Sequence, residues 1–401
     1  MKVSLRQDRL DGAAAAGRAD RPAAAPLLSR DGPDVILGGH QGGSGLAEPV
    51  SPDARSLFGP RGACLASEDG PLFVADTGHH RLLIWRDRPR TAATPADLVI
   101  GQPDFTREGR NAKSEPGAAT LNVPTGIAAR GGVLAVADAW NHRVLLWHGY
   151  PDRDNRPADV VLGQVGFTAN LANRGLDAPR ADTLNWCYGV SIADGRLLVS
   201  DTGNRRVLIW DAVPQTHGAP ADLVLGQADF TCRDENAGRS IGATGMRWPH
   251  AIAARGASLM VADAGNNRVM VWNALPAGNG VPCDCVLGQT GFTDQEHNRA
   301  AYLPDAAALS MPYGLTIQGD RLIVADTANS RLLGYPLGRL AMGAAATHLA
   351  GQHGFADKGD NRWTPASRDS LCWPYGATAC GNTLVIADSG NNRVSLWRTA
   401  P

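Results

Sequence analysis

The sequence predicts an all-β protein, a six-bladed β-propeller made of four-stranded antiparallel blades and closed by an N-terminal strand that pairs into the C-terminal blade. Three observations support this fold class. One twelve-residue stretch recurs six times at an almost constant spacing. Each full period contains four short runs of β-strand composition, and the fourth run of the last period is missing. A matching run occurs ahead of the first period, so the ring can close without a free sheet edge at its seam.

The repeated stretch is clearest at Val261–Trp272, which reads Val-Ala-Asp-Ala-Gly-Asn-Asn-Arg-Val-Met-Val-Trp. Its aspartates are separated by 62 or 63 residues and stand at Asp76, Asp138, Asp201, Asp263, Asp326 and Asp388. A constant period of this kind is typical of proteins built from stacked supersecondary units. The 47 glycines and 26 prolines fit the many turns that such a chain needs.

The second period shows how each unit divides. Run a follows Pro124, run b is Val133–Asp138, run c is Arg143–Trp147 and run d is Asp159–Gly163. Between b and c the commonest sequence is Asp-x-Gly-Asn-x-Arg. Glycine and asparagine tolerate positive φ and aspartate can bond turn amides, so we expect a tight hairpin and an antiparallel sheet.

The ends of the chain predict the closure. The last period stops after run c, and the missing run d matches Asp34-Val35-Ile36-Leu37-Gly38. We therefore expect residues 34–401 to form a single propeller. Residues 1–33, rich in alanine, arginine and aspartate, are expected to form a mobile N-terminal tail.

Residues 34–397 resemble the NHL-repeat family, in particular bacterial NHL repeat-containing proteins. The resemblance is carried by Val-Ala-Asp-Thr-Gly-Asn/His-x-Arg-Val-Leu-Ile-Trp after a Pro-x-Gly-Ile/Val-Ala run, in six copies. Run d is followed by Leu-Gly-Gln-x-x-Phe-Thr, which looks like a bacterial variant of the repeat. The resemblance implies a six-bladed NHL propeller, a fold that often presents one loop face to a protein, a peptide or RNA.

Composition limits the partners. With 38 basic and 39 acidic residues, the chain carries no overall field that would attract nucleic acid or an anionic membrane. No apolar segment approaches the ~18 residues of a transmembrane helix, and no signal peptide is recognisable. Seven cysteines without repeat spacing favour reduced thiols. We expect a soluble, cytoplasmic monomer that binds neither membranes nor nucleic acid.

Residues that recur in every copy are predicted to be structural. Run c ends in a tryptophan in five copies and in Tyr335 in the other, which indicates packing between blades. The turn aspartates, each followed five residues later by an arginine, are expected to form turn bonds or ion pairs, although a ring of carboxylates around a metal is an alternative. The connections from d to a take about 20 residues and in five copies share a glutamine, a phenylalanine and an asparagine, which are interpreted as braces and a plug.

The repeat positions whose residues differ between the copies are the candidates for function. In a propeller, run a lines the central channel, so the residue after the repeat proline rings the channel mouth. The six mouth positions hold Arg61, Thr125, Tyr188, His250, Tyr313 and Tyr375. Tryptophans outside run c map to the same face. The predicted ligand-binding residues are Arg61, Trp140, Trp186, Tyr188, Trp248, His250, Tyr313, Trp373 and Tyr375.

Two interpretations of this mouth remain open. An aromatic cup suits stacking or cation–π contact with a flat or cationic ligand, so a small molecule, a peptide or a protein is the expected partner. Alternatively, the aromatic side chains fill the channel and serve only packing.

A third interpretation is an enzyme, a lyase or hydrolase, with chemistry around His250. The resemblance to NHL-type amidating lyases implies zinc held by histidines that follow the repeat proline, but only His250 matches. Catalytic zinc needs about three protein ligands. Related propeller lactonases hold a metal through acidic or amide side chains, and no mouth position is acidic. No metal or cofactor is therefore predicted, and catalytic residues stay unassigned.

Overall fold

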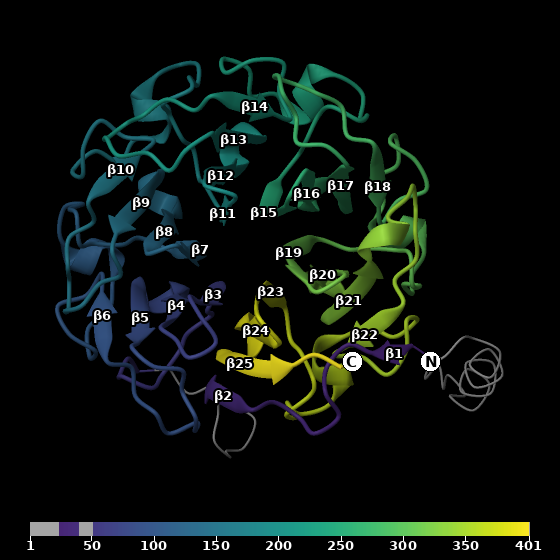
Figure 1. The fold of residues 1–401 in the computed structure, drawn as a ribbon, viewed down its shortest axis with the longest axis horizontal. Helices are drawn as coiled ribbons and strands as arrows, with labels where there is room; N and C mark the ends of the chain where they lie inside the picture. Colours follow the sequence, from purple (N-terminus) through teal and green to yellow (C-terminus); the bar gives the residue numbers. More distant parts are fainter. Residues whose placement is uncertain (1–23, 40–50, 401) are drawn as a thin grey trace, which may run out of the picture.

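The computed structural model describes residues 24–39 and 51–400 and shows a ring of six blades around a central axis (Figure 1). Within each blade, neighbouring strands are antiparallel. The alternation of runs a to d therefore folds as the sequence predicts, and the predicted all-β, six-bladed, four-stranded architecture is confirmed.

Each blade runs from an inner strand at the channel to a short outer strand. The inner strands, which correspond to run a, are β3 (Gly62–Leu65), β7 (Pro124–Arg130), β11 (Val190–Ala193), β15 (Pro249–Arg255), β19 (Pro312–Gln318) and β23 (Pro374–Cys380). Next come β4 (Leu72–Asp76), β8 (Val133–Asp138), β12 (Arg196–Asp201), β16 (Ser258–Asp263), β20 (Arg321–Asp326) and β24 (Thr383–Asp388). The third strands are β5 (Arg81–Trp85), β9 (Arg143–His148), β13 (Arg206–Trp210), β17 (Arg268–Trp272), β21 (Arg331–Pro336) and β25 (Arg393–Arg398). The outer strands are β6 (Leu98–Ile100), β10 (Val160–Leu162), β14 (Leu223–Leu225), β18 (Cys285–Leu287), β22 (His348–Ala350) and β2 (Val35–Gly38).

The helices of the described chain are 3₁₀-type turns of three or four residues, and those in the long loops include left-handed residues such as Asn298. Six of them join the second and third strands of the blades: η1 (Thr77–His79), η3 (Ala139–Asn141), η5 (Thr202–Asn204), η7 (Ala264–Asn266), η9 (Thr327–Asn329) and η12 (Ser389–Asn391). Five lie in the long loops between blades: η2 (Arg110–Lys113), η4 (Ala172–Gly175), η6 (Glu235–Gly238), η8 (His297–Ala300) and η11 (Asp360–Trp363). The last, η10 (Leu337–Arg339), follows β21. No helix in the described ranges is long and apolar enough to cross a membrane.

The predicted closure of the ring is confirmed. Strand β2 lies antiparallel to β25 at the edge of the sixth blade, with Leu37 opposite Val394. Val35 and Leu37 face the core, whereas Ile36 is only half-buried, as expected for alternating side chains on a strand. The first and last strands of the propeller thus belong to one sheet, which removes the free edge of β25.

Residues 24–33, which the sequence analysis assigned to the N-terminal tail, are packed onto the propeller. Strand β1 (Ala25–Pro26) pairs in parallel with β22 of the fifth blade. Leu27 is fully buried, and Leu28 forms a β-bridge with Thr399 of the sixth blade. Burial of two consecutive leucines holds this segment against the propeller. The remainder of the predicted mobile tail, residues 1–23, lies outside the described residues.

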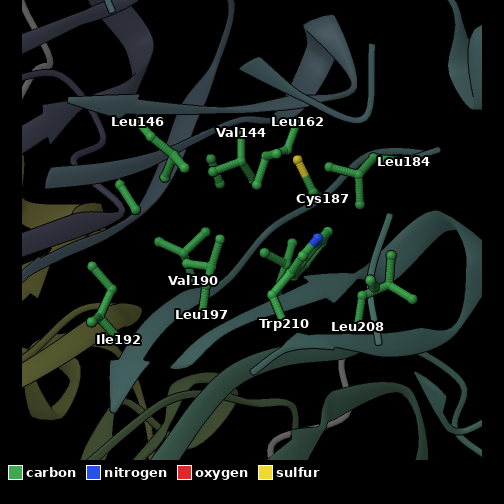
Figure 2. Packing of buried hydrophobic residues seen from close by; sticks show 14 of the residues in the cluster. Val144, Leu146, Leu162, Leu184, Cys187, Val190, Ile192, Leu197, Leu208 and Trp210 are labelled. Carbon is green, nitrogen blue, oxygen red and sulfur yellow. The ribbon is translucent and has the colours of Figure 1, made fainter. Parts of the chain in front are cut away.

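The hydrophobic core lies between neighbouring blades. Figure 2 shows one such layer, in which Val144 and Leu162 of the second blade face Leu197 and Trp210 of the third. The tryptophans at the ends of the third strands are almost fully buried. In four blades the indole Nε1 donates to a backbone carbonyl nine residues later, as from Trp272 to Val281 at 3.1 Å. Their predicted packing role is confirmed, at about 3–5 kcal/mol each by the usual cost of truncating a core aromatic.

Candidate functional site

A buried ion pair in every blade forms the repeated frame of the site. In the fourth blade, Arg268 Nε lies 2.9 Å from Asp263 Oδ2, and both side chains are fully buried. The same arginine donates to the carbonyls of Phe292 and Gly245, while Asp263 Oδ1 accepts the backbone N–H of Arg247 at 2.8 Å. The pair therefore ties the turn to the two adjoining long loops, and the predicted structural role of these residues is confirmed.

Glutamine and asparagine brace the long loops, also as predicted. Gln289 Nε2 donates to the carbonyls of Asn267 and Glu296, at 3.0 and 2.9 Å. Asn298 and Asn329 exchange reciprocal amide hydrogen bonds of 3.2 and 2.8 Å between loop and turn. The first blade departs from this pattern, because His79 occupies the turn position and contacts Asp76 Oδ2 through Nδ1 at 2.8 Å.

At the mouth, side chains from separate blades converge on one another. His250 stacks on Tyr313 with ring centroids 4.2 Å apart, and the ring centroid of Tyr188 also lies 4.2 Å from that of His250. Tyr375 lies 4.8 Å from Tyr313, and the guanidinium carbon of Arg61 sits 4.8 Å from the centroid of Tyr375. We call these five residues the mouth cluster. The remaining mouth residue, Thr125, is buried and donates to the carbonyl of Tyr188.

Small residues after the mouth positions explain how the cluster becomes so tight. A Cβ atom on Gly189 would lie 2.0 Å from the carbonyl oxygen of His250, and one on Gly62 would lie 2.1 Å from that of Thr125. Real Cβ atoms do not approach this closely, so glycine allows the inner strands to lie side by side. In the fourth blade Ala251 takes the equivalent position.

The predicted tryptophans divide into two groups. Trp186 meets the cluster edge-on, with centroids 6.4 Å from Tyr188 and 6.5 Å from His250. Trp140 and Trp248 instead lie beneath the guanidinium groups of Arg110 and Arg247, and Trp373 is half-exposed. The structure thus brings together six of the nine predicted residues: Arg61, Trp186, Tyr188, His250, Tyr313 and Tyr375.

Burial controls the protonation of the cluster. It lowers the pKa of His250 to about 4, an effect that the hydrogen bond from its Nδ1 to the Trp248 carbonyl at 2.9 Å only partly offsets. Burial also raises the pKa of Tyr188 well above its ordinary value and that of Tyr313 to about 12. The neighbouring Tyr188 raises the pKa of Arg61. At neutral pH the His250 imidazole is therefore neutral, the phenols of Tyr188 and Tyr313 are protonated, and Arg61 carries a positive charge.

One polar atom of the mouth cluster, the hydroxyl oxygen of Tyr188, is buried in surroundings that the repeated sequence does not predict. Tyr188 is 5% exposed, and its hydroxyl makes no hydrogen bond of ordinary geometry within the described chain. Across the same part of the chain, no three histidine, cysteine, aspartate or glutamate side chains gather in a metal-binding arrangement.

A second feature that the sequence did not indicate is a pocket of about 520 Å³ at the seam of the ring. It lies between the segment around β1 and the loop that follows β22, and its lining includes Arg30, Arg362, Arg368, His353 and Trp397. Only the absence of a run d after Trp397 could have pointed to it.

Comparison with known proteins supports the fold alone. No protein-family model matches the chain, and no curated protein matches its sequence. A Bacteroides thetaiotaomicron protein of unknown function aligns with a TM-score of 0.51 and 12% identity, over 94% of this chain and 75% of that one. Kuenenia stuttgartiensis hydrazine synthase (TM-score 0.49, 13% identity, 90% and 99% coverage) and the WD40 propeller domain of Doa1 (0.47, 8%, 91% and 96%) are also similar.

Proposed function

We propose that this chain is an NHL-type propeller that binds a small molecule or a peptide at its channel mouth. The observation that carries the proposal is the mouth cluster itself. Its five side chains, one arginine, one histidine and three tyrosines, occupy equivalent positions of a repeated frame, and Arg61, Tyr313 and Tyr375 keep part of their surface exposed. If the side chains at the mouth only had to fill the channel, identical apolar residues at the six positions would be sufficient. Differentiated polar aromatics at such a place are typical of ligand sites.

The protonation of the cluster supports binding more than acid–base catalysis. General acids and bases work best with pKa values near the working pH. Burial lowers the pKa of His250 to about 4 and raises that of Tyr313 to about 12, so both groups move away from neutrality. We therefore propose recognition rather than lyase or hydrolase chemistry around His250.

The composition supports the remaining parts of the proposal. Nearly equal numbers of acidic and basic residues favour a partner other than nucleic acid. Seven unpaired cysteines fit a reducing compartment, the cytoplasm. We propose that the protein acts there as a monomer, with its ligand held at the mouth.

Screening aromatic fragments by ¹⁹F NMR tests the proposed site. We expect fluorinated fragments to show line broadening with the wild-type protein and to lose it with a His250→Ala, Tyr313→Phe double variant. The matched control is the pair His297→Ala, Tyr302→Phe, which changes the same residue types at exposed positions. Unchanged broadening with the mouth variant, at a melting temperature close to that of the wild type, would refute binding at the mouth.

A further inference from the structure

The positive charge of Arg61 has no ionic partner among the described residues. The six repeat arginines each contact a buried aspartate within 2.9 Å. Arg61, by contrast, forms no ion pair in residues 24–39 and 51–400, and its guanidinium group contacts the rings of Tyr375 and Tyr188. A half-buried cation surrounded by aromatic rings keeps little of its hydration, so an anion beside it would be bound more strongly than in water.

The polar groups near Arg61 are also mostly donors. Tyr188 and Tyr313 are protonated at neutral pH, and burial raises their pKa values still further above it. The Tyr188 hydroxyl is buried beside the Arg61 guanidinium group, and its own proton has no acceptor in the described chain. A buried donor without an acceptor costs about 1–3 kcal/mol, which a ligand acceptor would recover. The guanidinium and this phenol together form a donor set that matches an oxyanion.

We propose that the channel mouth selects a planar ligand that carries a carboxylate, with the carboxylate against Arg61 and the Tyr188 hydroxyl and the planar part against Tyr313 and Trp186. The proposal rests on the proposed function of the mouth as a binding site. It revises the ligand chemistry expected from the sequence, because Arg61 already occupies the cation–π position over Tyr375. A cationic ligand would therefore meet a like charge where the sequence suggested an open aromatic cup.

Three probes of nearly equal shape test this proposal: benzoate, neutral benzamide and cationic benzamidine. We expect benzoate to bind the wild-type protein most tightly and benzamidine most weakly, as measured by ligand-detected NMR titration. An Arg61→Gln variant should weaken benzoate binding by about tenfold to a hundredfold, which is the usual loss of a charged hydrogen-bonded contact, and should leave benzamide nearly unchanged. Arg61→Lys keeps the charge without the planar fork and should fall between the two.

Arg247→Gln provides the matched control. Arg247 also lies over an aromatic ring, that of Trp248, but it has an acidic partner in Glu235 at 3.5 Å. Removing its charge should change benzoate affinity less than the Arg61 variants do. Melting temperatures of all variants are measured in parallel, so that a folding defect is not mistaken for a lost contact.

The outcomes separate this proposal from the proposed function. If benzamide binds at the mouth, and the His250→Ala, Tyr313→Phe variant abolishes its binding, while benzoate has no advantage, the mouth is a binding site and the carboxylate proposal is wrong. The same conclusion follows if Arg61→Gln weakens all three probes equally. If no probe responds to the mouth variant, both proposals fail. A purely structural Arg61 would lower the melting temperature without changing the order of the probes.

Discussion

The left-handed residue that ends each turn between the second and third strands acts as a hydrogen-bond acceptor for the next blade. In five copies its side chain accepts the backbone N–H of the residue before the repeat proline or its substitute. These acceptors hold the receiving residue at positive φ, even the β-branched Val123. In the remaining copy the turn residue is Arg205, which has no acceptor atom, and Trp248 is absent from the positive-φ residues. The Trp248 carbonyl then accepts from His250. The copy that has Arg205 at the turn is therefore also the copy in which the residue before the repeat proline, Trp248, is not at positive φ and in which its carbonyl bonds to His250.

Two of these acceptors are histidines, so stability should depend on pH. Nδ1 of His80 accepts from Val123 and Nδ1 of His142 from Trp186, which requires neutral imidazoles. Burial is the main cause that lowers the pKa of both. A lowered histidine pKa means that stability is fully present above the unfolded-state value of roughly 6.5 and is lost as the pH falls below it. We expect the free energy of unfolding, measured by urea denaturation, to decrease over that range, with about 0.5–1.5 kcal/mol from each hydrogen bond.

A His80→Asn, His142→Asn variant keeps an acceptor without a titrating group, as Asn267 and Asn392 do in other copies. It should flatten the pH profile, and His297→Asn at an exposed position should not. A profile with the same slope in the double variant would show that these histidines do not carry the dependence. The sequence does not reveal this role of the two histidines, because each bond joins residues 43 or 44 positions apart in different blades.

At the scale of elements, the contact between inner strands determines the width of the mouth. Glycine follows the mouth residue in five of six copies, and the backbone of one strand lies against the carbonyl of the next. The sequence predicted these strands and placed run a at the channel, because β-strand composition and turn residues mark the runs in each copy. It did not predict the side-chain convergence at the axis. That convergence depends on how closely neighbouring strands approach, a property that no single repeat contains.

Gly189→Ala should therefore destabilise the protein and disturb the mouth. The added methyl group would lie 2.0 Å from the His250 carbonyl oxygen, and backbone cannot give way as a flexible side chain can. We expect a loss of about 1–3 kcal/mol in unfolding free energy, the usual cost of overpacking, together with weaker binding of aromatic fragments. Gly166→Ala is the control, because nothing lies within 4 Å of its added Cβ, and its effect should stay within about 0.5 kcal/mol. Equal stability of the two variants would contradict the tight contact between β11 and β15.

At the scale of the whole molecule, residues 24–33, which precede β2, take the place of a loop that other blades have between their third and outer strands. In other blades the loop between third and outer strands covers the outer strand of the preceding blade, as where the Gly280 N–H donates to the Val224 carbonyl at 3.0 Å. In the sixth blade the outer strand is β2, which precedes the other three strands in the chain, so no such loop joins it to β25. Residues 24–33 cover β22 instead, and the Leu27 N–H donates to the Leu349 carbonyl at 3.0 Å. The sequence predicted closure by β2 because that run matches the repeat. It could not reveal the covering segment, whose residues match no repeated pattern.

Because residues 24–33 act like the loop between the third and outer strands of another blade, we expect that the chain can be opened at such a loop and still close the ring. Opening the chain between Ala277 and Gly278, with residues 1–23 joining the original ends, would create a protein whose first strand is β18 and whose last is β17. The new N-terminal residues would cover β14 as residues 24–33 cover β22, so we expect a cooperative unfolding transition and wild-type circular dichroism. Opening between Gly265 and Asn266 is the matched control, because it separates Asp263 from Arg268 and cuts a turn in which Asn266 is fully buried. That permutant should be several kcal/mol less stable or fail to fold, since it divides a buried ion pair between two loose ends. If both permutants are equally stable, the position at which the chain is opened does not matter. In that case the covering role of residues 24–33 is not what holds the ring closed.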